Sequence, residues 1–427
     1  MPQVSADKPF PVDDVRRRFP TLATAGPFIF FDNAAGAQVP TRVLEAVADH
    51  LLSRNVQRGG PYRRSREVDA MLARARESVA AFVNARSADE IAFGLNATSF
   101  IRTLSLAIGR TLGSRSEIVV SELDHEANIA TWLDLERVGA RVIWWRVRHD
   151  GRLHVSDLEP LVGPRTRLVA CTIASNATGS LVDVMAVARL AHAVGAEVFL
   201  DAVHYAPHGP IDVQRFDCDY LVCSGYKMFA PHMGFAWCRR EAINDLPTFR
   251  EHFIPDVTPD KLEAGTYAYE SVAGMDAAIR YLEDVGHQCA DRQAEPPASC
   301  RSDTLRLAMT RIAEYERTLS TRLLDEIEGI AGVTIYGVID REQIDERVPT
   351  LAFSVAGIPA SAVAEGLAAR DVGVRNGHMY SPRLIARLGL TDGGVVRASL
   401  VHYNTVAEVA RFRSALVDLM GERHPGS

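Results

Sequence analysis

One lysine, Lys227, stands where its surroundings could give it unusual chemistry. The apolar residues 220–223 are typical of a short buried strand, and Ser224-Gly225 indicates a turn directly after it. Small, aromatic and turn-forming residues follow, so we expect the ammonium group of Lys227 to be partly desolvated, which lowers its pKa. A neutral amine in such a place can form a Schiff base with a carbonyl group. An ordinary lysine that reaches water from a strand end is the alternative interpretation.

Three other apolar runs, at 118–121, 168–173 and 197–200, are also typical of strands that end in polar residues. Helix-like segments separate several of the strands, which predicts right-handed βαβ units and a mostly parallel sheet. Ligands of such sheets bind at the carboxyl ends of the strands. Each polar residue alone has an ordinary explanation, as a loop residue, an Asx turn or a helix cap. Their coincidence at one edge favours a functional site made of Lys227 with His125, Asn176, Asp201 and His204.

A candidate anion site precedes these strands. Residues 90–93 are predicted to form a strand, and an apolar helix is predicted at 100–112. Between them lies a small polar segment that contains Ala97, Thr98 and Ser99. The unpaired N–H groups and the positive dipole end of a helix attract anions, and hydroxyl groups add donors. The signal is weak by itself, because many helices begin with Thr or Ser as a cap.

These groups together suit pyridoxal phosphate. A lysine amine can hold the cofactor as a Schiff base, and a carboxylate can keep its pyridinium nitrogen protonated. A flat side chain can stack on the ring, and a helix N-terminus can hold the phosphate. Lys227, Asp201 and His125 are the candidates for the first three tasks.

Motifs along nearly the whole chain resemble those of the class V aminotransferase family, and within it the cysteine-desulfurase-like branch. They are Asp201-x-x-His204, Ser224-Gly225-Tyr226-Lys227, His125-Glu126-Ala127-Asn128-Ile129, Glu263-Ala264-Gly265-Thr266, Phe31-Asp32-Asn33-Ala34-Ala35 and Arg397-Ala398-Ser399-Leu400-Val401-His402-Tyr403-Asn404-Thr405. The resemblance implies a pyridoxal-phosphate enzyme with the α/β architecture of the fold type I transferases. We therefore expect a large domain with a mostly parallel, seven-stranded sheet and a smaller C-terminal α/β domain.

The resemblance also implies a role in cofactor binding for each matched residue. Lys227 forms the internal Schiff base and later moves the Cα proton, Asp201 bonds the pyridinium nitrogen, and His125 stacks on the ring. The other residues hold the ring hydroxyl or the phosphate: His204 and Asn176 the hydroxyl, and Ala97, Thr98, Ser224 and Tyr226 the phosphate. Tyr226 stands where the family commonly has a phosphate-binding His.

Substrate and subunit contacts are implied in the same way. Arg397 resembles the arginine that grips the substrate carboxylate as a bidentate fork. Arg375, Asn33 and Ala35 are further candidates for substrate binding. Thr266 resembles a residue that reaches the phosphate of the neighbouring subunit, which implies a homodimer with shared active sites.

The chain departs from the desulfurases at the residue that would carry sulfur. Desulfurases have a nucleophilic Cys on a loop after an Arg-x-Gly-His motif, whereas the segment here contains Arg375, His378 and then Tyr380, and no cysteine follows Cys300. A phenol cannot form a persulfide, so the sequence argues against a cysteine desulfurase unless Cys289 or Cys300 serves instead. His378, Tyr380 and Arg375 are candidate acid, base or orienting groups for the substrate, with a surface loop as the alternative.

Several reactions at the Cα of an α-amino acid stay open, because the cofactor stabilises a Cα carbanion however it is made. Trp144-Trp145, Pro207-His208-x-Pro210 and residues 401–405 resemble a branch that includes a decarboxylative aldolase, which also lacks the cysteine. A lyase-type reaction, either β-elimination or decarboxylative carbon–carbon bond formation, is therefore favoured over transamination, and racemisation stays open. A desulfurase with a non-standard cysteine and a binding protein that kept the fold are the remaining alternatives.

The composition sets broad limits. The 427 residues carry 47 Lys and Arg against 54 Asp and Glu, a net charge of −7, which argues against nucleic acid or an anionic membrane as the main partner. No apolar run reaches the roughly 20 residues that span a bilayer, and residues 1–10 do not resemble a secretory signal. The six cysteines show no metal-like spacing. Together with the family resemblance, these limits lead us to expect a cytoplasmic enzyme without a metal that acts on a small amino-acid substrate.

Four segments are expected along the chain. Residues 1–25 are expected to pack on the small domain, residues 26–285 to form the large cofactor domain, and residues 306–427 to form the small domain. Residues 286–305 are polar and contain Pro296-Pro297, so they are predicted to be a flexible insertion.

Overall fold

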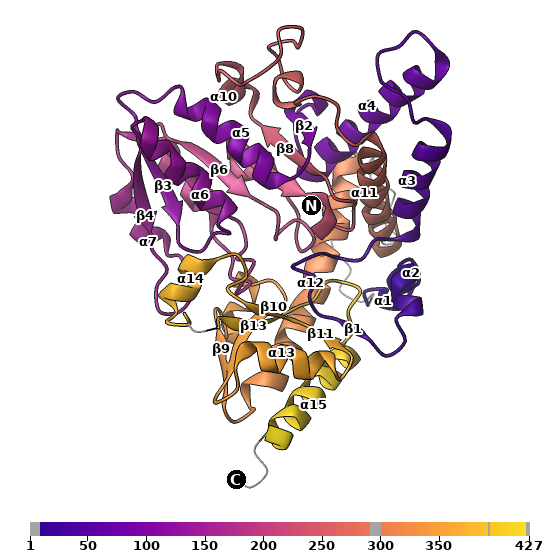
Figure 1. The fold of residues 1–427 in the computed structure, drawn as a ribbon, viewed down its shortest axis with the longest axis vertical. Helices are drawn as coiled ribbons and strands as arrows, with labels where there is room; N and C mark the ends of the chain where they lie inside the picture. The colour runs from indigo at the N-terminus through magenta and orange to yellow at the C-terminus, as the bar shows by residue number, and fades with distance from the viewer. Residues whose placement is uncertain (1–8, 291–299, 392, 424–427) are drawn as a thin grey trace.

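The computed structural model of the chain describes residues 9–290, 300–391 and 393–423 (Figure 1). Its larger sheet has seven strands in the order β2-β8-β7-β6-β5-β3-β4. Strand β8 runs antiparallel to both neighbours, and the other neighbouring strands are parallel, so the expected mostly parallel sheet is confirmed. The strands are β2 (Ile91–Gly94), β3 (Glu117–Ser121), β4 (Arg141–Trp145), β5 (Thr166–Thr172), β6 (Glu197–Asp201), β7 (Tyr220–Ser224) and β8 (Gly234–Cys238).

Helices cover both faces of this sheet, which explains why its strands read as continuous apolar runs. Ile118 and Val120 of β3 share one core with residues of α5 (Ala97–Gly109), whereas Val119 enters a second core with α4 and α11. Figure 1 shows α5 and α6 in front of the strands. The other helices of this part are α3 (Thr41–Ser53), α4 (Arg63–Val83), α6 (Ala127–Leu133), α7 (Val155–Leu158), α8 (Val184–Ala193), α9 (Val213–Phe216), α10 (Arg240–Asn244) and α11 (Tyr269–Cys289).

The C-terminal part has its own antiparallel sheet of four strands, in the order β12-β13-β10-β9. Side chains of α12, α13 and α15 share one apolar core with it, which confirms the smaller α/β unit. Strand β1 (Ile29–Phe30) pairs in parallel with β11 (Val372–Gly373) and brings residues 31–38 beside this sheet. The other elements are α12 (Arg301–Glu328), β9 (Val333–Tyr336), β10 (Thr350–Val355), α13 (Ala360–Ala368), β12 (Arg375–Gly377), α14 (Pro382–Arg387), β13 (Val395–Ser399) and α15 (Val406–Arg423).

Differences from the predicted elements occur mainly at their ends. The helix predicted at 100–112 begins at Ala97, because Asn96 caps it in a reciprocal pair of hydrogen bonds with Ser99. Of the insertion predicted at 286–305, both ends are helical, since α11 continues to Cys289 and α12 begins at Arg301. The rest of that prediction, residues 291–299, lies outside the described residues.

The described N-terminal residues form two short helices, α1 (Val12–Arg17) and α2 (Pro20–Thr24), that contact both parts of the chain. Arg16 pairs with Glu408 of α15 at 3.0 Å, whereas the ring of Phe19 packs against Phe229 and Tyr281. Packing on the small unit is thus only part of their contacts, and the division into domains stays a prediction. Within the described ranges, no helix is both long and apolar enough to cross a membrane.

Candidate active site

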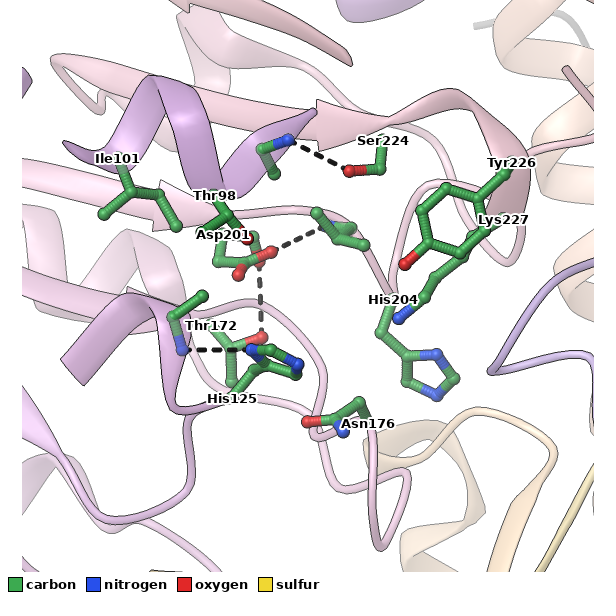
Figure 2. Close-up of a pocket in the computed structure, with 13 residues that line it drawn as sticks. Thr98, Ile101, His125, Thr172, Asn176, Asp201, His204, Ser224, Tyr226 and Lys227 are labelled. Atoms are coloured by element: carbon green, nitrogen blue, oxygen red, sulfur yellow. Dashed lines mark hydrogen bonds between the residues drawn. The ribbon is translucent and has the colours of Figure 1, made fainter. Parts of the chain in front are cut away.

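The carboxyl ends of β5, β6 and β7 meet the N-terminus of α5 at one pocket (Figure 2). It encloses about 430 Å³ of space, part of which is open to solvent. Nine residues predicted to bind the cofactor line this pocket: Lys227, Asp201, His204, His125, Asn176, Ala97, Thr98, Ser224 and Tyr226. The structure therefore brings together, from segments far apart in the chain, the residues that the sequence singled out.

Lys227 ends a 3-10 turn that follows β7 directly. Its side chain is buried, and burial lowers the pKa of its amine to about 8, helped by the positive charge of Arg397 and opposed by Asp201. Gly225 permits this turn, because a Cβ there would lie 2.7 Å from the carbonyl oxygen of Pro231. A substantial part of the amine is thus neutral near pH 7.5, as nucleophilic chemistry requires.

Asp201 and His125 both line the pocket, and their surroundings determine their hydrogen bonds and their protonation. Oδ1 of Asp201 accepts a hydrogen bond from the Val203 N–H at 2.9 Å. Burial raises the pKa of this carboxyl group, whereas the Val203 hydrogen bond and the charge of Lys227 act the other way. Nδ1 of His125 accepts from the Ala127 N–H at 3.0 Å, which places the ring proton on Nε2. Burial, with cationic side chains nearby, lowers the pKa of His125 to about 4, so its ring is neutral at pH 7.

The N-terminus of α5 faces the same pocket (Figure 2). Asn96 caps this helix, and the Ala97 N–H donates to the Ser224 hydroxyl at 3.0 Å. Gly234 of β8 allows the close approach, because a Cβ there would lie 2.6 Å from Asn96. Thr98 lies in the first turn of α5 and also lines the pocket. The backbone N–H groups, the helix dipole and the hydroxyls form an anion site.

The donor set of the pocket fits pyridoxal phosphate. The amine of Lys227 suits the aldehyde carbon, the carboxylate of Asp201 suits the pyridinium nitrogen, and the start of α5 suits the phosphate. A cation beside Asp201 would also offset the burial that raises the pKa of this carboxyl group. All three groups line one cavity, so one molecule can contact all of them.

Asn176 and His204 line the pocket, but neighbouring residues engage several of their polar atoms. Nδ2 of Asn176 donates to the Met379 carbonyl at 2.6 Å, and its Oδ1 accepts from the Ser381 hydroxyl at 3.0 Å. Nε2 of His204 lies 3.0 Å from the Thr350 hydroxyl. Burial lowers the pKa of His204 well below its usual range, so the ring is neutral. The nitrogen and the oxygen of the Asn176 amide are each therefore engaged by the loop after β12.

Two arginines lie beside the pocket on neighbouring strands. Arg397 of β13 is buried, and it donates from Nη1 to the Asn176 carbonyl at 2.8 Å and from Nη2 to Asp32 at 2.9 Å. Burial lowers the pKa of Arg397, and Asp32 opposes this shift. Arg375 of β12 donates to the same carboxylate, from Nη2 at 2.8 Å and from Nε at 3.0 Å. This bond raises the pKa of Arg375.

Asn33 and Ala35 lie outside the cofactor pocket, although substrate binding was predicted for both. Together with Arg375 they line a neighbouring cavity. The amide nitrogen of Asn33 donates to the carbonyls of Phe30 and Ser399, at 2.8 and 2.9 Å. The structure therefore uses Asn33 to hold the segment after β1 against the smaller sheet.

Thr266 also lies outside the pocket of its own chain. It is exposed, and its hydroxyl accepts from Nε2 of Gln57 at 2.8 Å. This placement is compatible with the expected contact to a neighbouring subunit, because a residue that served its own pocket would line it.

The loop after β12 reaches the edge of the pocket and brings Tyr380 to His125. Their ring centroids lie 5.6 Å apart with an interplanar angle of 32°. Met379 and Tyr380 both have positive φ values, 53° and 58°, which L residues adopt only where surrounding contacts hold them. Nδ1 of His378 accepts from the Tyr380 N–H at 3.0 Å. The Tyr380 side chain is half exposed, so its phenol is open to a substrate.

Two further residues at this site were not singled out from the sequence. Asp32 belongs to a motif that was noticed, but only its small neighbours were considered. Thr172 lines the pocket, and its hydroxyl donates to the backbone carbonyls of Ala174 at 2.8 Å and of Asp201 at 3.3 Å. The position of Thr172 at the end of β5 was the signal that could have found it.

A match to a protein-family model defines the class of this protein. The model described as Aminotransferase class-V matches residues 29–308 and 302–412. The chain belongs to this family, and it is a pyridoxal-phosphate-dependent enzyme. The expected family and cofactor are thereby confirmed.

Individual relatives match nearly the whole chain. Aminotransferase-like protein FGM3 of Gibberella zeae is 34% identical over 95% of this chain and 98% of its own length. A probable cysteine desulfurase of Streptomyces coelicolor is 31% identical over 95% of both chains. The crystal structure of the cysteine desulfurase CsdA of Escherichia coli has a TM-score of 0.83 at 27% identity, over 97% of this chain and 100% of that one. The apo structure of a cysteine desulfurase of Thermococcus onnurineus has a TM-score of 0.84 at 26% identity, over 98% of this chain and 100% of that one. These structures confirm the expected fold.

Proposed function

We propose that the chain catalyses a lyase-type reaction on an α-amino acid, either a β-elimination or a decarboxylative formation of a carbon–carbon bond. One observation carries this proposal. At the edge of a pocket that holds Lys227, Asp201 and the start of α5, the side chain packed against His125 is the phenol of Tyr380. The pocket supports bond breaking at Cα, and a phenol cannot take up sulfur.

Each group at the pocket has a task in this proposal. The bound cofactor accepts the electron pair that is released when a bond to Cα breaks. Asp201 holds the ring nitrogen, His125 packs against the ring face, and the start of α5 holds the phosphate. Nζ of Lys227 accepts and returns the proton at Cα, for which a pKa of about 8 is well matched to neutral pH. Arg397 binds the α-carboxylate of the substrate.

His378 and Tyr380 are proposed to serve the side-chain end of the substrate. Their rings are 6.0 Å apart, and the hydrogen bond from the Tyr380 N–H to Nδ1 places the proton of His378 on Nε2. The exposed phenol of Tyr380 can donate a proton to a leaving group or accept one from it.

A cysteine desulfurase is the second candidate, because several relatives carry that name. Such an enzyme needs a thiol that reaches the substrate. Cys171 and Cys223 are buried in β5 and β7, where burial raises the pKa of both thiols. Cys300 lines a different cavity, beside Asp303 and Arg306. These placements favour the lyase over the desulfurase.

We also propose a cytoplasmic homodimer with shared sites. The exposed Thr266 supports it, and so do the large apolar side chains of Leu95, Phe249 and Phe253, which are exposed in the single chain. Sedimentation of the cofactor-loaded protein should give the mass of two chains. A single-chain mass at micromolar concentration would contradict the dimer.

An amino-acid panel tests the proposed function. Purified, cofactor-loaded protein is offered individual amino acids, with and without an added aldehyde, and the cofactor spectrum is followed together with sulfide, carbon dioxide, pyruvate and other keto acids. Pyruvate without sulfide supports β-elimination, and carbon dioxide that appears with an aldehyde adduct supports carbon–carbon bond formation. Sulfide with alanine from cysteine would overturn the proposal, and keto acids formed with amino-group transfer would show an aminotransferase instead.

A further inference from the structure

Asp32 bridges two arginines that face each other across β12 and β13. Arg375 and Arg397 are register partners in this antiparallel pair, so their like charges would repel if nothing lay between them. Asp32 reaches both from the segment after β1. Its Oδ1 accepts from Nη2 of Arg397 at 2.9 Å, and its Oδ2 accepts from Nη2 of Arg375 at 2.8 Å. Two positive charges and one negative charge leave the cluster with one net positive charge.

Arg397 keeps a donor for one more carboxylate. Its Nε is buried and has no hydrogen-bond partner among the described residues. Nε and Nη2 form the side of a guanidinium group that binds a carboxylate with two bonds, and Asp32 uses only Nη2 of this pair. Arg375 differs, because both its Nε and its Nη2 already donate to Asp32. A substrate carboxylate bound at Arg397 would therefore bring the net charge of the cluster to zero.

We propose that Asp32 is a specificity-determining residue that restricts the site to amino acids with a single carboxylate. The inference rests on the proposed function, and it adds that the side chain of the amino-acid substrate carries no carboxylate. A second carboxylate placed near Asp32 would meet its negative charge in a cluster with no net positive charge left, so its loss of hydration would be poorly offset. The cavity next to the cluster is lined by Asp32 and Arg375 themselves together with Phe28 and Phe30.

The test compares amino acids of equal shape and different charge. Dissociation constants of glutamate against glutamine, and of aspartate against asparagine, are measured on the cofactor-loaded protein by calorimetry and by the change in the cofactor spectrum. In the wild type the amides should bind more tightly than the acids. Asp32→Asn leaves two positive charges, so binding of the acids relative to the amides should improve about tenfold, which corresponds to about 1.4 kcal/mol.

Two further variants make the test specific. Asp32→Asn combined with Arg375→Gln returns the cluster to one positive charge, so the gain for acids should disappear. Arg375→Gln alone leaves no net charge and should weaken binding of both amides about tenfold. Asp32→Asn is uninformative if it loses its cofactor spectrum or its cooperative unfolding. In that case Arg375→Gln tests the proposal, because unchanged binding of the amides in this variant would overturn it.

The same measurements can also overturn the proposal. A ratio of acid to amide affinity that stays the same in folded Asp32→Asn, or no detectable gain for glutamate and aspartate, overturns the role of Asp32. Failure of the proposed function would be seen elsewhere, as sulfide and alanine from cysteine in the product panel, whatever the charge preference of the variants.

Discussion

The backbone N–H of Glu126 donates a hydrogen bond to the carbonyl oxygen of Tyr380 at 2.8 Å. This bond joins the loop after β12 to the residue next to His125, and the bonds from Asn176 to Met379 and from Ser381 to Asn176 secure it from the other side. Tyr380 is therefore fixed by its backbone while its phenol stays open to solvent. The loop therefore holds Tyr380 at a fixed position beside His125.

The phenol of Tyr380 should be needed for turnover. Tyr380→Phe keeps the ring beside His125 and removes the hydroxyl, so kcat should fall about a hundredfold if the phenol transfers a proton. The cofactor spectrum should not change, because Tyr380 is not among the cofactor residues. Tyr380→Leu is the matched control, since it removes both the ring and the hydroxyl. Equal kcat values for wild type and Tyr380→Phe would reduce Tyr380 to a packing role.

Arg397 should decide substrate affinity. Arg397→Gln removes the buried guanidinium group that we assign to the α-carboxylate, and losing one partner of such a pair costs about 2–5 kcal/mol, or at least about thirtyfold in affinity. Arg397→Lys keeps the charge without the fork, so its effect should be intermediate. Substrate titrations of the cofactor-loaded variants measure both. Unchanged substrate affinity in Arg397→Gln would refute the assignment.

Burial of Lys227 should be visible in the pH dependence of stability of the cofactor-free protein. The pKa of this amine is about 8 in the folded chain against 10.5 for an ordinary lysine. The charged folded form is therefore penalised below pH 8, and the penalty disappears between pH 8 and 10.5 as the amine becomes neutral. The unfolding free energy of wild type should rise by about 3 kcal/mol over this interval relative to Lys227→Met. Denaturant titrations across the interval check it.

Lys261 supplies the control for this measurement. Its Nζ is also buried, but it pairs with Asp256 at 2.9 Å and donates to the Asn244 carbonyl at 2.9 Å. Lys261→Met should therefore destabilise the protein at pH 7. If the difference in unfolding free energy between wild type and Lys227→Met stays constant from pH 8 to pH 10.5, the folded chain does not shift the pKa of Lys227.

Ser224 should contribute to cofactor retention at the phosphate end. Its hydroxyl meets the Ala97 N–H at the start of α5, and losing one such hydrogen-bonding group costs about 1 kcal/mol, or roughly fivefold in cofactor affinity. Equilibrium dialysis of Ser224→Ala measures this loss. Ser99→Ala is the control, because Ser99 belongs to the cap of the same helix and does not line the pocket. An equal loss in both variants would indicate a general effect on α5.

Much of the pocket could be predicted, because several of its residues lie at or directly after the ends of strands. Asp201 and Lys227 come directly after apolar runs, and the carboxyl ends of parallel strands share one edge. The placement of such residues depends on the topology of the sheet, which the alternation of strands and helices indicates. Their protonation follows from burial, which the apolar runs around Lys227 also indicate.

Sequence patterns did not indicate several contacts between distant segments. Asn176 looked available to a cofactor, but a loop from the smaller sheet takes both functions of its amide. Asn33 was predicted to contact the substrate, and the structure adds hydrogen bonds from its amide nitrogen to the carbonyls of Phe30 and Ser399. Asp32 was overlooked because its two arginine partners come from β12 and β13, far along the chain. Sequence patterns show which residues share an element, whereas these pairings depend on how the two sheets meet.

The most direct test asks which lysine carries the cofactor. The sequence has three lysines, Lys8, Lys227 and Lys261, so the answer is a single choice. Borohydride reduction of the cofactor-loaded protein fixes the pyridoxyl group to the amine that holds it, and mass spectrometry of the peptides locates it. We predict modification at Lys227 and its complete loss in Lys227→Ala, with Lys261→Ala modified like the wild type. A pyridoxyl group on Lys8 or Lys261, or an unchanged visible band in Lys227→Ala, would show that Lys227 does not carry the cofactor.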